Sequence, residues 1–517
     1  MSSLISIPIG LITSLSAENA LIIMRNVFRA ECRYCKLSPS TLTLSEKLNV
    51  ADGGIDAQVD TDQEVPNDCI FKTGLTGFQL KSGTSFKPWN DSSIEAELIN
   101  SNGRLFAEVE RLLQHNGSYV VICTGHDLTP QQRNNSKLII AKIFNRLGYP
   151  KREDLIDVLG ASQLAEFIER HPAVAAAITP NPIQDALLID EWQQNAHMSN
   201  PFEPSKEQSE IIEQIRDGLL GSAKHIRILG EPGLGKSRIT LEAVRHVDIA
   251  PIVLYFEHGT RFGQSQIFGY LLKNKTEYPL VLVIDELPEQ EMTEIWAHLK
   301  NRSGALKLVT LDHGHDETYD SEIQRLQAPK LDDETIKGII ARHVGESREL
   351  DRWVEICEGS PRVAQAVAEN LRANPDDILR SPATVPLWDR FLHGYERRDQ
   401  QQVRQIDCAT RHVALFSRFG FEDPVSDEAR YIAGLIEQAD PSITWARFQE
   451  IIRSLRARRV LQGSRTLFFV PRALHIHLWK QFWESYGHGF RFKDVFKSMP
   501  TSLHTWFMSM FKFAVMV

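Results

Sequence analysis

Residues 230–237 have the types and spacing of a phosphate-binding loop. The segment reads GEPGLGKS and fits G-x-x-x-x-G-K-[ST], between an expected strand at His225–Leu229 and an expected helix. Its three glycines let backbone N–H groups curl around phosphate oxygens at a helix N-terminus. Lys236 is expected to reach the β- and γ-phosphates, and the Ser237 hydroxyl to hold Mg²⁺. The nucleotide contacts predicted from this stretch are Gly230, Glu231, Pro232, Gly233, Leu234, Gly235, Lys236, Ser237 and Arg238.

An acidic pair follows a run of five apolar residues. Asp285 and Glu286 come directly after Leu280–Ile284, a run typical of a strand that is buried on both faces of a parallel sheet. Asp285 would bind Mg²⁺ through water, and Glu286 would polarise the attacking water, as in hydrolytic ATPases. The alternative is a strand-end pair that caps the next helix. The loop and the acidic pair together predict ATP and Mg²⁺ as cofactors.

A different chemistry is indicated near the N-terminus. Gly53-Gly54-Ile55-Asp56 is followed, 23 residues after the aspartate, by Gln79-Leu80-Lys81. An aspartate and a Gln-x-Lys pair on adjacent strands suit a metal-dependent phosphodiesterase, because side chains two apart share a strand face. Asp56 would bind one or two Mg²⁺ ions with help from the Gln79 carbonyl. Lys81 would orient the attacking water or stabilise charge.

The helix expected over Ala17–Ala30 supplies further candidates for this site. Glu18 would be its third carboxylate, although a glutamate on a helix face can also serve solvation alone. Arg25, Arg29 and Arg33 recur every four residues and could face a phosphate backbone. The expected metal ligands are Glu18, Asp56 and Gln79 here, and Ser237 and Asp285 in the nucleotide site. The expected catalytic residues are Asp56, Gln79, Lys81, Glu18 and Glu286.

The composition is that of an ordinary soluble protein of several domains. The chain has 517 residues, 42% hydrophobic and 24% charged, and a formal net charge of −9, which argues against non-specific coating of nucleic acid. Six cysteines are too few for a disulfide scaffold and point to a reducing cytoplasm. Cys32 and Cys35 form a CxxC pair, but zinc needs four ligands, so buried thiols are expected there and at Cys69. No signal peptide or membrane span is expected.

Alternating strand and helix patterns predict an α/β fold in two successive parts. In the first part, strands are expected at Gly54–Val59, Gly77–Leu80 and Tyr119–Cys123, and a helix at Ser162–Arg170. A connecting helix is expected at Asp185–Gln194 between two proline-containing breaks. In the second part, strands are expected at His225–Leu229, Ile252–Phe256, Leu280–Ile284 and Leu306–Leu311. A helical region and a late strand, Arg465–Val470, follow.

The order of these motifs resembles that of STAND-class NTPases. Gly359-Ser360-Pro361 matches a GxP motif that, in that class, contacts the nucleotide from a helical subdomain. Residues 455–479 resemble a winged helix, and His475 or His477 would then reach the β-phosphate; alternatively, either histidine merely covers an amphipathic helix. One departure is that Thr310-Leu311-Asp312-His313 stands where the class commonly has a sensor arginine, and Arg302 comes too early.

The N-terminal motif G-G-I-D…F-Q-L-K resembles that of the Mrr-like branch of the PD-(D/E)xK nucleases, in which glutamine replaces an acidic residue. With the FRAECRY stretch at Phe28–Tyr34, the whole resembles antiviral STAND NTPases of prokaryotes that carry an Mrr-like effector. The resemblance implies that a viral protein triggers assembly of a homo-oligomer, a tetramer, that cuts double-stranded DNA. A regulatory NTPase whose N-terminal domain only binds a partner or DNA is the other function considered.

The resemblance also implies the domain order. The expected fold is α/β and multidomain, with a restriction-endonuclease-like domain, a P-loop NTPase with a parallel sheet, a helical subdomain and a winged helix. The boundaries are 1–180 for the nuclease, 181–204 for a linker helix, 205–328 for the NTPase core, 329–395 for the helical subdomain, 396–490 for the winged helix and 491–517 for the last part. The aromatic face of Leu503–Val517 suggests the start of a missing repeat sensor; a separate sensor subunit and a membrane-lying tail are the alternatives.

Overall fold

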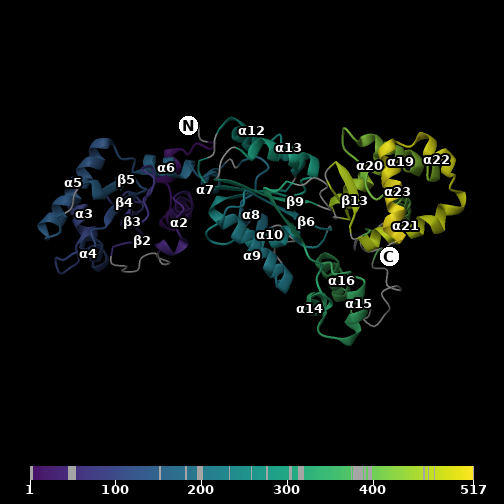
Figure 1. Cartoon of the computed structure of the whole chain (residues 1–517), viewed down its shortest axis with the longest axis horizontal. Coiled ribbons are helices and arrows are strands. Elements are labelled where there is room, and N and C mark those ends of the chain that lie inside the picture. The colour runs from purple at the N-terminus through teal and green to yellow at the C-terminus, as the bar shows by residue number, and fades with distance from the viewer. Residues whose placement is uncertain are drawn as a thin grey trace.

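The computed structural model describes most of the chain, and Figure 1 shows its parts in sequence order. An N-terminal α/β domain adjoins a central α/β domain; a small helical domain and a C-terminal domain follow. The residues outside the description are 1–3, 45–53, 151–152, 181–182, 195–201, 232, 258, 275–276, 302–304, 313–319, 374, 376–387, 389–391, 394–398, 458–459, 464, 471 and 516–517. Gly53, Pro232, Arg302 and His313 of the expectations above are among them.

A five-stranded sheet in the order β1-β2-β3-β4-β5 forms the centre of the N-terminal domain. Antiparallel pairs join β1 to β2 and β2 to β3, and parallel pairs join β3 to β4 and β4 to β5. The three predicted strands correspond to β2, β3 and β4, apart from their ends, and the sequence misses β1 and β5. The strands are β1 (Leu42–Leu44), β2 (Ala57–Thr61), β3 (Gly74–Lys81), β4 (Ser118–Cys123) and β5 (Ile156–Leu159).

Helices cover both faces of this sheet. On one face, α2 (Ala17–Tyr34) buries Val27 and Phe28 against Phe78. The Ser16 hydroxyl begins this helix by accepting from Asn19 N. The same side carries α1 (Ile9–Thr13), α6 (Ala161–Glu169) and α7 (Pro172–Ile178), and the opposite face packs against α3 (Asp91–Leu98), α4 (Ala107–Gln114) and α5 (Pro130–Arg146).

The connecting segment after residue 182 packs on the central domain. Leu187 forms a β-bridge with Tyr255, and α8 (Ile189–Gln194) buries Trp192 completely. The Trp192 ring stacks on Tyr255 with 3.8 Å between centroids and 7° between planes. The linker helix that the sequence predicts is therefore present, shorter than expected, and held against an edge strand.

The central domain is built on a fully parallel sheet in the order β10-β6-β9-β8-β7. Its strands are β6 (His225–Leu229), β7 (Val253–Phe256), β8 (Leu280–Ile284), β9 (Leu306–Asp312) and β10 (Ile323–Gln327). One face packs against α9 (Lys206–Leu220) and α10 (Lys236–Val244), and the other against α12 (Gln266–Lys273) and α13 (Glu289–Leu299). The sequence predicts four of these strands and misses β10, whose Ile-Gln-Arg-Leu-Gln pattern carries little apolar signal.

One continuous hydrophobic core runs from the N-terminal domain into the central domain. Buried residues of α2, such as Met24, belong to the same cluster as Ile212 of α9 and Ile228 of β6. The helical domain, in contrast, has a core of its own, centred on Trp353 and Ile340. Its helices are α14 (Asp333–Val344), α15 (Asp351–Glu355) and α16 (Pro361–Ala373).

The C-terminal domain combines helices with a three-stranded antiparallel sheet in the order β11-β13-β12. Its elements are α18 (Gln400–Val413), β11 (Phe419–Gly420), α19 (Ser426–Ala439), α20 (Trp445–Ala457), β12 (Leu461–Gln462), β13 (Thr466–Phe469), α21 (Arg472–Tyr486), α22 (Phe492–Ser498) and α23 (Thr501–Val515). The late strand that the sequence predicts corresponds to β13.

The aromatic face of the last helix lies inside this domain. Leu503, Phe507 and Met510 of α23 are buried, and Leu503 and Phe507 belong to the same core as Phe482 of α21. The described part of this face therefore packs against the chain's own C-terminal core, and the repeat sensor expected to begin here stays a prediction. Within the described residues, no helix is both long and apolar enough to cross a bilayer.

Candidate functional site

The loop between β6 and α10 has the backbone shape of a phosphate cradle. Gly230, Gly233 and Gly235 adopt φ of +149°, +86° and +84°, which L side chains rarely tolerate. Gly235 also begins α10 as its N-cap, so the positive end of the helix dipole points into the loop. The spacing of glycines that the sequence shows is therefore required by the backbone.

Lys236 lies inside this loop. Its Nζ donates to Gly230 O at 2.7 Å and to Glu231 O at 3.0 Å, and the side chain is 5% exposed. Burial lowers the pKa of Lys236 from 10.5 to about 8, although Asp285 and Asp312 nearby oppose that shift. An ammonium that donates to neutral loop carbonyls is well placed to exchange them for phosphate oxygens.

Ser237 and Asp285 meet beside the lysine. Ser237 Oγ donates to Asp285 Oδ2 at 2.5 Å, and the Tyr255 hydroxyl donates to the same oxygen at 3.1 Å. Burial, followed by the nearby Glu286 charge, raises the pKa of Asp285 above its usual value. A carboxylate that burial destabilises in this way would be stabilised by a divalent cation, so the donor set of a hydroxyl and a carboxylate fits Mg²⁺.

Glu286 stands in a strained backbone conformation. Its φ is +51°, in the left-handed region, and its N–H donates to Asp285 Oδ1 at 2.8 Å. The acidic pair does not cap the next helix, since α13 begins after Pro288 with no side-chain cap. The helix-cap alternative is therefore wrong, and the turn instead holds the half-buried Glu286 next to the loop.

The helical domain touches the phosphate loop directly. Ser360 Oγ donates to Gly233 O at 3.2 Å, and Arg362 N–H donates to the same carbonyl at 3.4 Å. A Cβ at Gly235 would lie 3.7 Å from Pro361 Cγ. The GxP segment, which the sequence places far from the loop, therefore packs onto it at the N-terminus of α16.

An arginine absent from the sequence expectations lies behind the site. Arg227 of β6 is fully buried, donates to Leu287 O at 2.7 Å, and pairs with Asp312 Oδ2 at 3.2 Å. Asp312 ends β9, where the sequence lacks the sensor arginine of the related class. The positive charge near this strand end comes instead from the neighbouring strand, which only the sheet order reveals.

The two histidines proposed for the β-phosphate differ in their surroundings. His475 is 2% exposed, its Nε2 lies 3.1 Å from Ala414 O, and burial lowers its pKa to about 4. It lies inside the C-terminal domain, and its expected contact with a nucleotide stays a prediction. His477 is half-buried, near Gln481 and the Trp388 ring, and stays a candidate.

In the N-terminal domain, the structure brings three of the expected residues to one end of β2 and β3. Asp56 N–H donates to Phe78 O at 2.8 Å, and its Oδ2 accepts from Leu80 N at 2.6 Å. Asp56 and Leu80 line a small cavity beside α2, whereas Gln79 lines another beside α3, together with Glu97. The antiparallel pairing of β2 with β3 explains the hydrogen bonds of Asp56, because it places the start of one strand beside the end of the other.

Two residues missed from the sequence hold this group. Glu97 of α3 forms an ion pair with Lys81, and its backbone carbonyl accepts from Gln79 Nε2 at 3.4 Å. The buried Tyr119 hydroxyl donates to Gln79 Oε1, the oxygen that the sequence assigns to a metal. Burial, then the charges of Asp56 and Glu97, raise the pKa of Tyr119 well above its usual value, so it stays a donor.

The third expected carboxylate does not join this group. Glu18 is exposed in the first turn of α2, where its negative charge interacts favourably with the positive end of the helix dipole. Among the residues that the structure describes, no three His, Cys, Asp or Glu side chains lie close enough to hold a metal ion. The donor set expected for an N-terminal metal, Glu18 with Asp56 and Gln79, is therefore not assembled here.

The arginines expected to form a basic stripe on α2 have different surroundings. Arg33 donates to Leu219 O at 3.2 Å and to Leu220 O at 3.1 Å, at the C-terminal end of α9. It therefore joins two domains and is not available to a phosphate backbone. Arg25 lines the same small cavity as Asp56, between α2 and the sheet.

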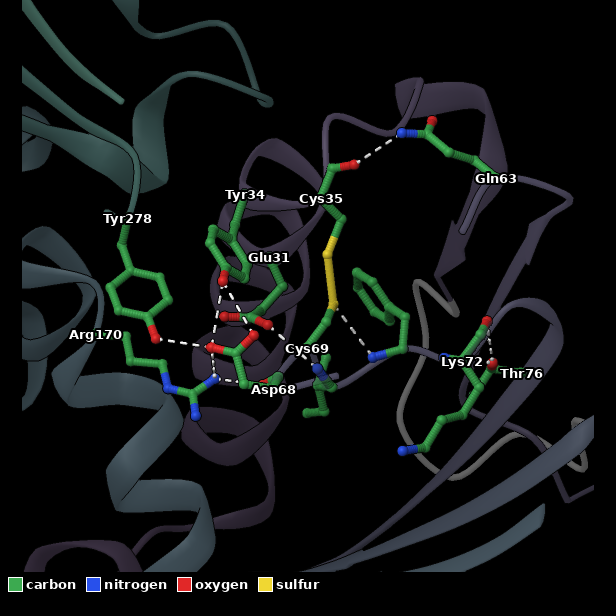
Figure 2. Close-up of a disulfide and its surroundings, with 12 residues drawn as sticks. Glu31, Tyr34, Cys35, Gln63, Asp68, Cys69, Lys72, Thr76, Arg170 and Tyr278 are labelled. Carbon is green, nitrogen blue, oxygen red and sulfur yellow. Dashed lines mark hydrogen bonds and ion pairs between the residues drawn. A yellow bond between two sulfur atoms is a disulfide. The ribbon is translucent and has the colours of Figure 1, made fainter. Parts of the chain in front are cut away.

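The cysteines near the end of α2 differ from the expectation. Cys35 and Cys69 form a disulfide (Figure 2), and the buried Cys32 stays a thiol. Burial raises the pKa of Cys32 to about 12, so this thiol is unreactive. The prediction of three buried thiols is therefore correct for Cys32 and wrong for the other two, because sequence spacing does not reveal which cysteines meet.

Comparisons with known proteins add little beyond this geometry. No protein-family model matches the chain, and no curated protein matches it. Solved structures with some likeness include PCH-2 of C. elegans (10% identity, TM-score 0.23), covering 35% of this chain and 65% of that one. The S. cerevisiae Hsp104:casein complex (14%, 0.29) covers 48% and 52%, and the Thermotoga maritima RuvB Holliday junction branch migration motor (13%, 0.30) covers 55% and 94%.

The chain thus spans less than two thirds of the PCH-2 and Hsp104 chains, and TM-scores this low carry no argument. The geometry of the site itself assigns the class of fold. A parallel sheet, a glycine loop between β6 and α10, and the Ser237–Asp285 contact define the central domain as a P-loop NTPase fold.

Proposed function

We propose that this chain is an ATP-binding switch of the STAND type that controls an N-terminal DNA-cleaving domain. The observation that carries the proposal is the contact between Ser237 and Asp285 beside the buried Lys236. These three side chains come from the loop and from the end of β8, and they are the ones that bind Mg²⁺–nucleotide in P-loop proteins. When bound, Mg²⁺ would neutralise charge on the β- and γ-phosphates.

The chain's own residues divide the work of the site. Lys236 would leave the two loop carbonyls and bind phosphate oxygens, while Ser237 and Asp285 would separate from each other to hold the cation. Glu286, held in place by its strained turn, would accept a proton from the attacking water. Tyr255 would keep its hydrogen bond to Asp285 and fix the orientation of that carboxylate.

The helical domain would report the state of the loop. Ser360 and Pro361 contact Gly233 and Gly235, so a movement of the loop around a nucleotide would displace the start of α16. Because this domain has a separate core, it can rotate as a unit without breaking the central domain. The C-terminal domain, with its three-stranded sheet, would be the winged helix of this class, and His477 its candidate contact to the nucleotide.

The N-terminal domain would be the effector, an Mrr-like, metal-dependent endonuclease acting on double-stranded DNA. The grouping of Asp56, Gln79 and Lys81 at one strand end supports this. By its resemblance to antiviral STAND NTPases, the protein would act in prokaryotic antiphage defence. A viral protein, recognised through a sensor, would trigger a homo-oligomer, a tetramer, that activates cleavage.

The second candidate is a regulatory NTPase whose N-terminal domain binds a partner or DNA without cutting it. The ion pair between Lys81 and Glu97, and the hydrogen bond from Tyr119 to Gln79, favour this alternative. Both contacts occupy groups that cleavage would need. Under the first proposal they describe a resting arrangement; under the second they are permanent structural contacts.

Plasmid cleavage separates the two functions. Wild-type protein, Lys81→Ala and Lys236→Ala are incubated with plasmid DNA, Mg²⁺ and ATP, with Lys72→Ala as a matched lysine control in the same domain. The endonuclease proposal expects cleavage by wild type and control, none by Lys81→Ala, and little by Lys236→Ala. If wild type and Lys81→Ala behave alike, the endonuclease proposal is wrong and the regulatory function is left.

A further inference from the structure

The disulfide lies at a joint between the N-terminal and central domains. Cys35 ends α2 as its C-cap, and Cys69 lies in the segment that joins β2 to β3, 34 residues further along the chain. Both cysteines are almost fully buried, with 3% and 4% exposure. Figure 2 shows the bond with Asp68 and Tyr34 beside it and Tyr278 approaching from the central domain.

The residues that precede the two cysteines form a clamp across this joint. Asp68 accepts from the Tyr34 hydroxyl at 3.0 Å and from the Tyr278 hydroxyl at 3.0 Å. Tyr34 and Asp68 belong to the N-terminal domain, whereas Tyr278 lies two residues before β8 of the central domain. One carboxylate therefore joins a helix end, a loop and a neighbouring domain.

Further contacts pack Tyr278 against the N-terminal domain. Its ring lies 4.7 Å from that of Tyr34, 5.7 Å from that of His171 and 5.4 Å from the Arg170 guanidinium. Arg170 also donates to the Asp68 carbonyl at 2.5 Å. Glu31 of α2 also holds the segment around Cys69, because its carboxylate accepts from Ile70 N at 3.2 Å.

The hydrogen bonds to the Asp68 side chain are weak by themselves, although Arg170 and Glu31 also hold the backbone beside it. The Asp68 side chain is 45% exposed, and exposed polar contacts of this kind contribute little, because water competes for them. The covalent bond next to it removes that weakness by restricting the segment 66–71 to the end of α2. The disulfide and the clamp therefore support each other.

We propose that Cys35 and Cys69 form a reversible redox site that tightens the contact between residues 66–71 and Tyr278. In the oxidised state the disulfide keeps Asp68 on Tyr278. In the reduced state the segment loosens and Tyr278 loses its acceptor. Because Tyr278 leads directly into β8, the strand that ends at Asp285, the clamp acts on the entry to a strand of the nucleotide site.

The chemistry of the switch is thiol–disulfide exchange with an external dithiol reductant. A thiolate of the reductant attacks one sulfur and breaks the Cys35–Cys69 bond, which leaves a mixed disulfide and one cysteine thiolate. The second thiol of the reductant then displaces the other cysteine. Two electrons and two protons pass to the cysteines, and the reductant becomes a disulfide. Since both sulfurs are buried, attack requires local opening of the segment.

That requirement gives a kinetic test on the full-length protein. The oxidised protein is treated with dithiothreitol, and free thiols are trapped with N-ethylmaleimide at successive times and counted by mass spectrometry. Tyr278→Phe removes the hydroxyl that donates to Asp68 and is expected to speed reduction about two- to fivefold, by making opening easier. Tyr149→Phe, which alters a tyrosine elsewhere in the same domain as the disulfide, is the matched control and should reduce at the wild-type rate.

Amide hydrogen exchange provides the second readout. Peptides that cover 66–71 and 277–281 should exchange about tenfold faster after reduction, because the loosened segment opens more often. Cys69→Ser should exchange at the fast rate with or without reductant, and Cys357→Ser should behave as wild type. The proposal is overturned if the oxidised protein contains no Cys35–Cys69 bond, if Tyr278→Phe and Tyr149→Phe are reduced equally fast, or if exchange at 277–281 ignores the redox state.

Discussion

Lys236 and Asp285 are side chains of opposite charge, and burial disfavours the charged form of each. Burial lowers the pKa of the lysine to about 8 and raises that of the aspartate. The lysine donates to the loop carbonyls, and the aspartate accepts from the hydroxyls of Ser237 and Tyr255. A phosphate with its cation would satisfy both at once.

The lysine pKa predicts how nucleotide affinity depends on pH. Lys236 binds phosphate as an ammonium, and in the free protein it loses that proton as pH rises through about 8. Affinity for ATP should therefore be constant below pH 7.5 and fall about tenfold per unit above pH 8.5. Titration with a fluorescent ATP analogue from pH 7 to 9.5 measures this. Lys236→Ala should show weak binding without that decline; a flat profile in wild type would contradict the assignment.

Replacement of Glu286 should separate ATP binding from ATP hydrolysis. Glu286→Gln keeps the shape of the strained turn but removes the base, so ATP should bind normally and hydrolysis should slow about 10²- to 10³-fold. Phosphate release measures turnover, and analogue binding measures affinity. Equal turnover in the variant and wild type would assign the attacking water to another residue.

At the scale of elements, the start of α16 rests on the phosphate loop through one side-chain hydrogen bond. Ser360→Ala removes the bond to Gly233 O, which is worth about 1 kcal/mol, so a bound nucleotide analogue should dissociate about fivefold faster. Stopped-flow displacement measures the rate. Ser347→Ala, which alters a helix cap elsewhere in the helical domain, is the control and should leave it unchanged. An unchanged rate in Ser360→Ala would mean that this domain does not sense the loop.

The elements also show how far sequence reasoning reaches. The strands at 225–229 and 280–284, the loop between strand and helix, and the Asp285 position follow from local patterns of apolar run and glycine spacing, and the structure confirms those elements. Arg227 and Glu97 were missed because their roles arise from sheet order and helix packing. The burial of His475 and the pairing of Cys35 with Cys69 depend in the same way on contacts between distant parts of the chain.

For the whole molecule, the shared core implies that the N-terminal and central domains move as one body. Trp192, fully buried in the connecting segment, belongs to that core and stacks on Tyr255. Trp192→Ala should cost about 3–5 kcal/mol and lower the first thermal transition, while leaving that of the C-terminal domain in place. Calorimetry of the full chain checks this. Ile22→Ala, on an exposed position, should change neither transition; an unaltered first transition in Trp192→Ala would contradict the shared core.

The nucleotide site is the centre of the account, so direct binding of ATP tests it best. Isothermal titration of the wild-type protein with ATP and Mg²⁺ should show one saturable site per chain. Lys236→Ala should bind at least about tenfold more weakly, since a charge-assisted contact is lost. Ser237→Ala should lose most of the Mg²⁺ dependence. Wild-type protein that does not bind ATP, or Lys236→Ala that binds it equally well, would contradict the account.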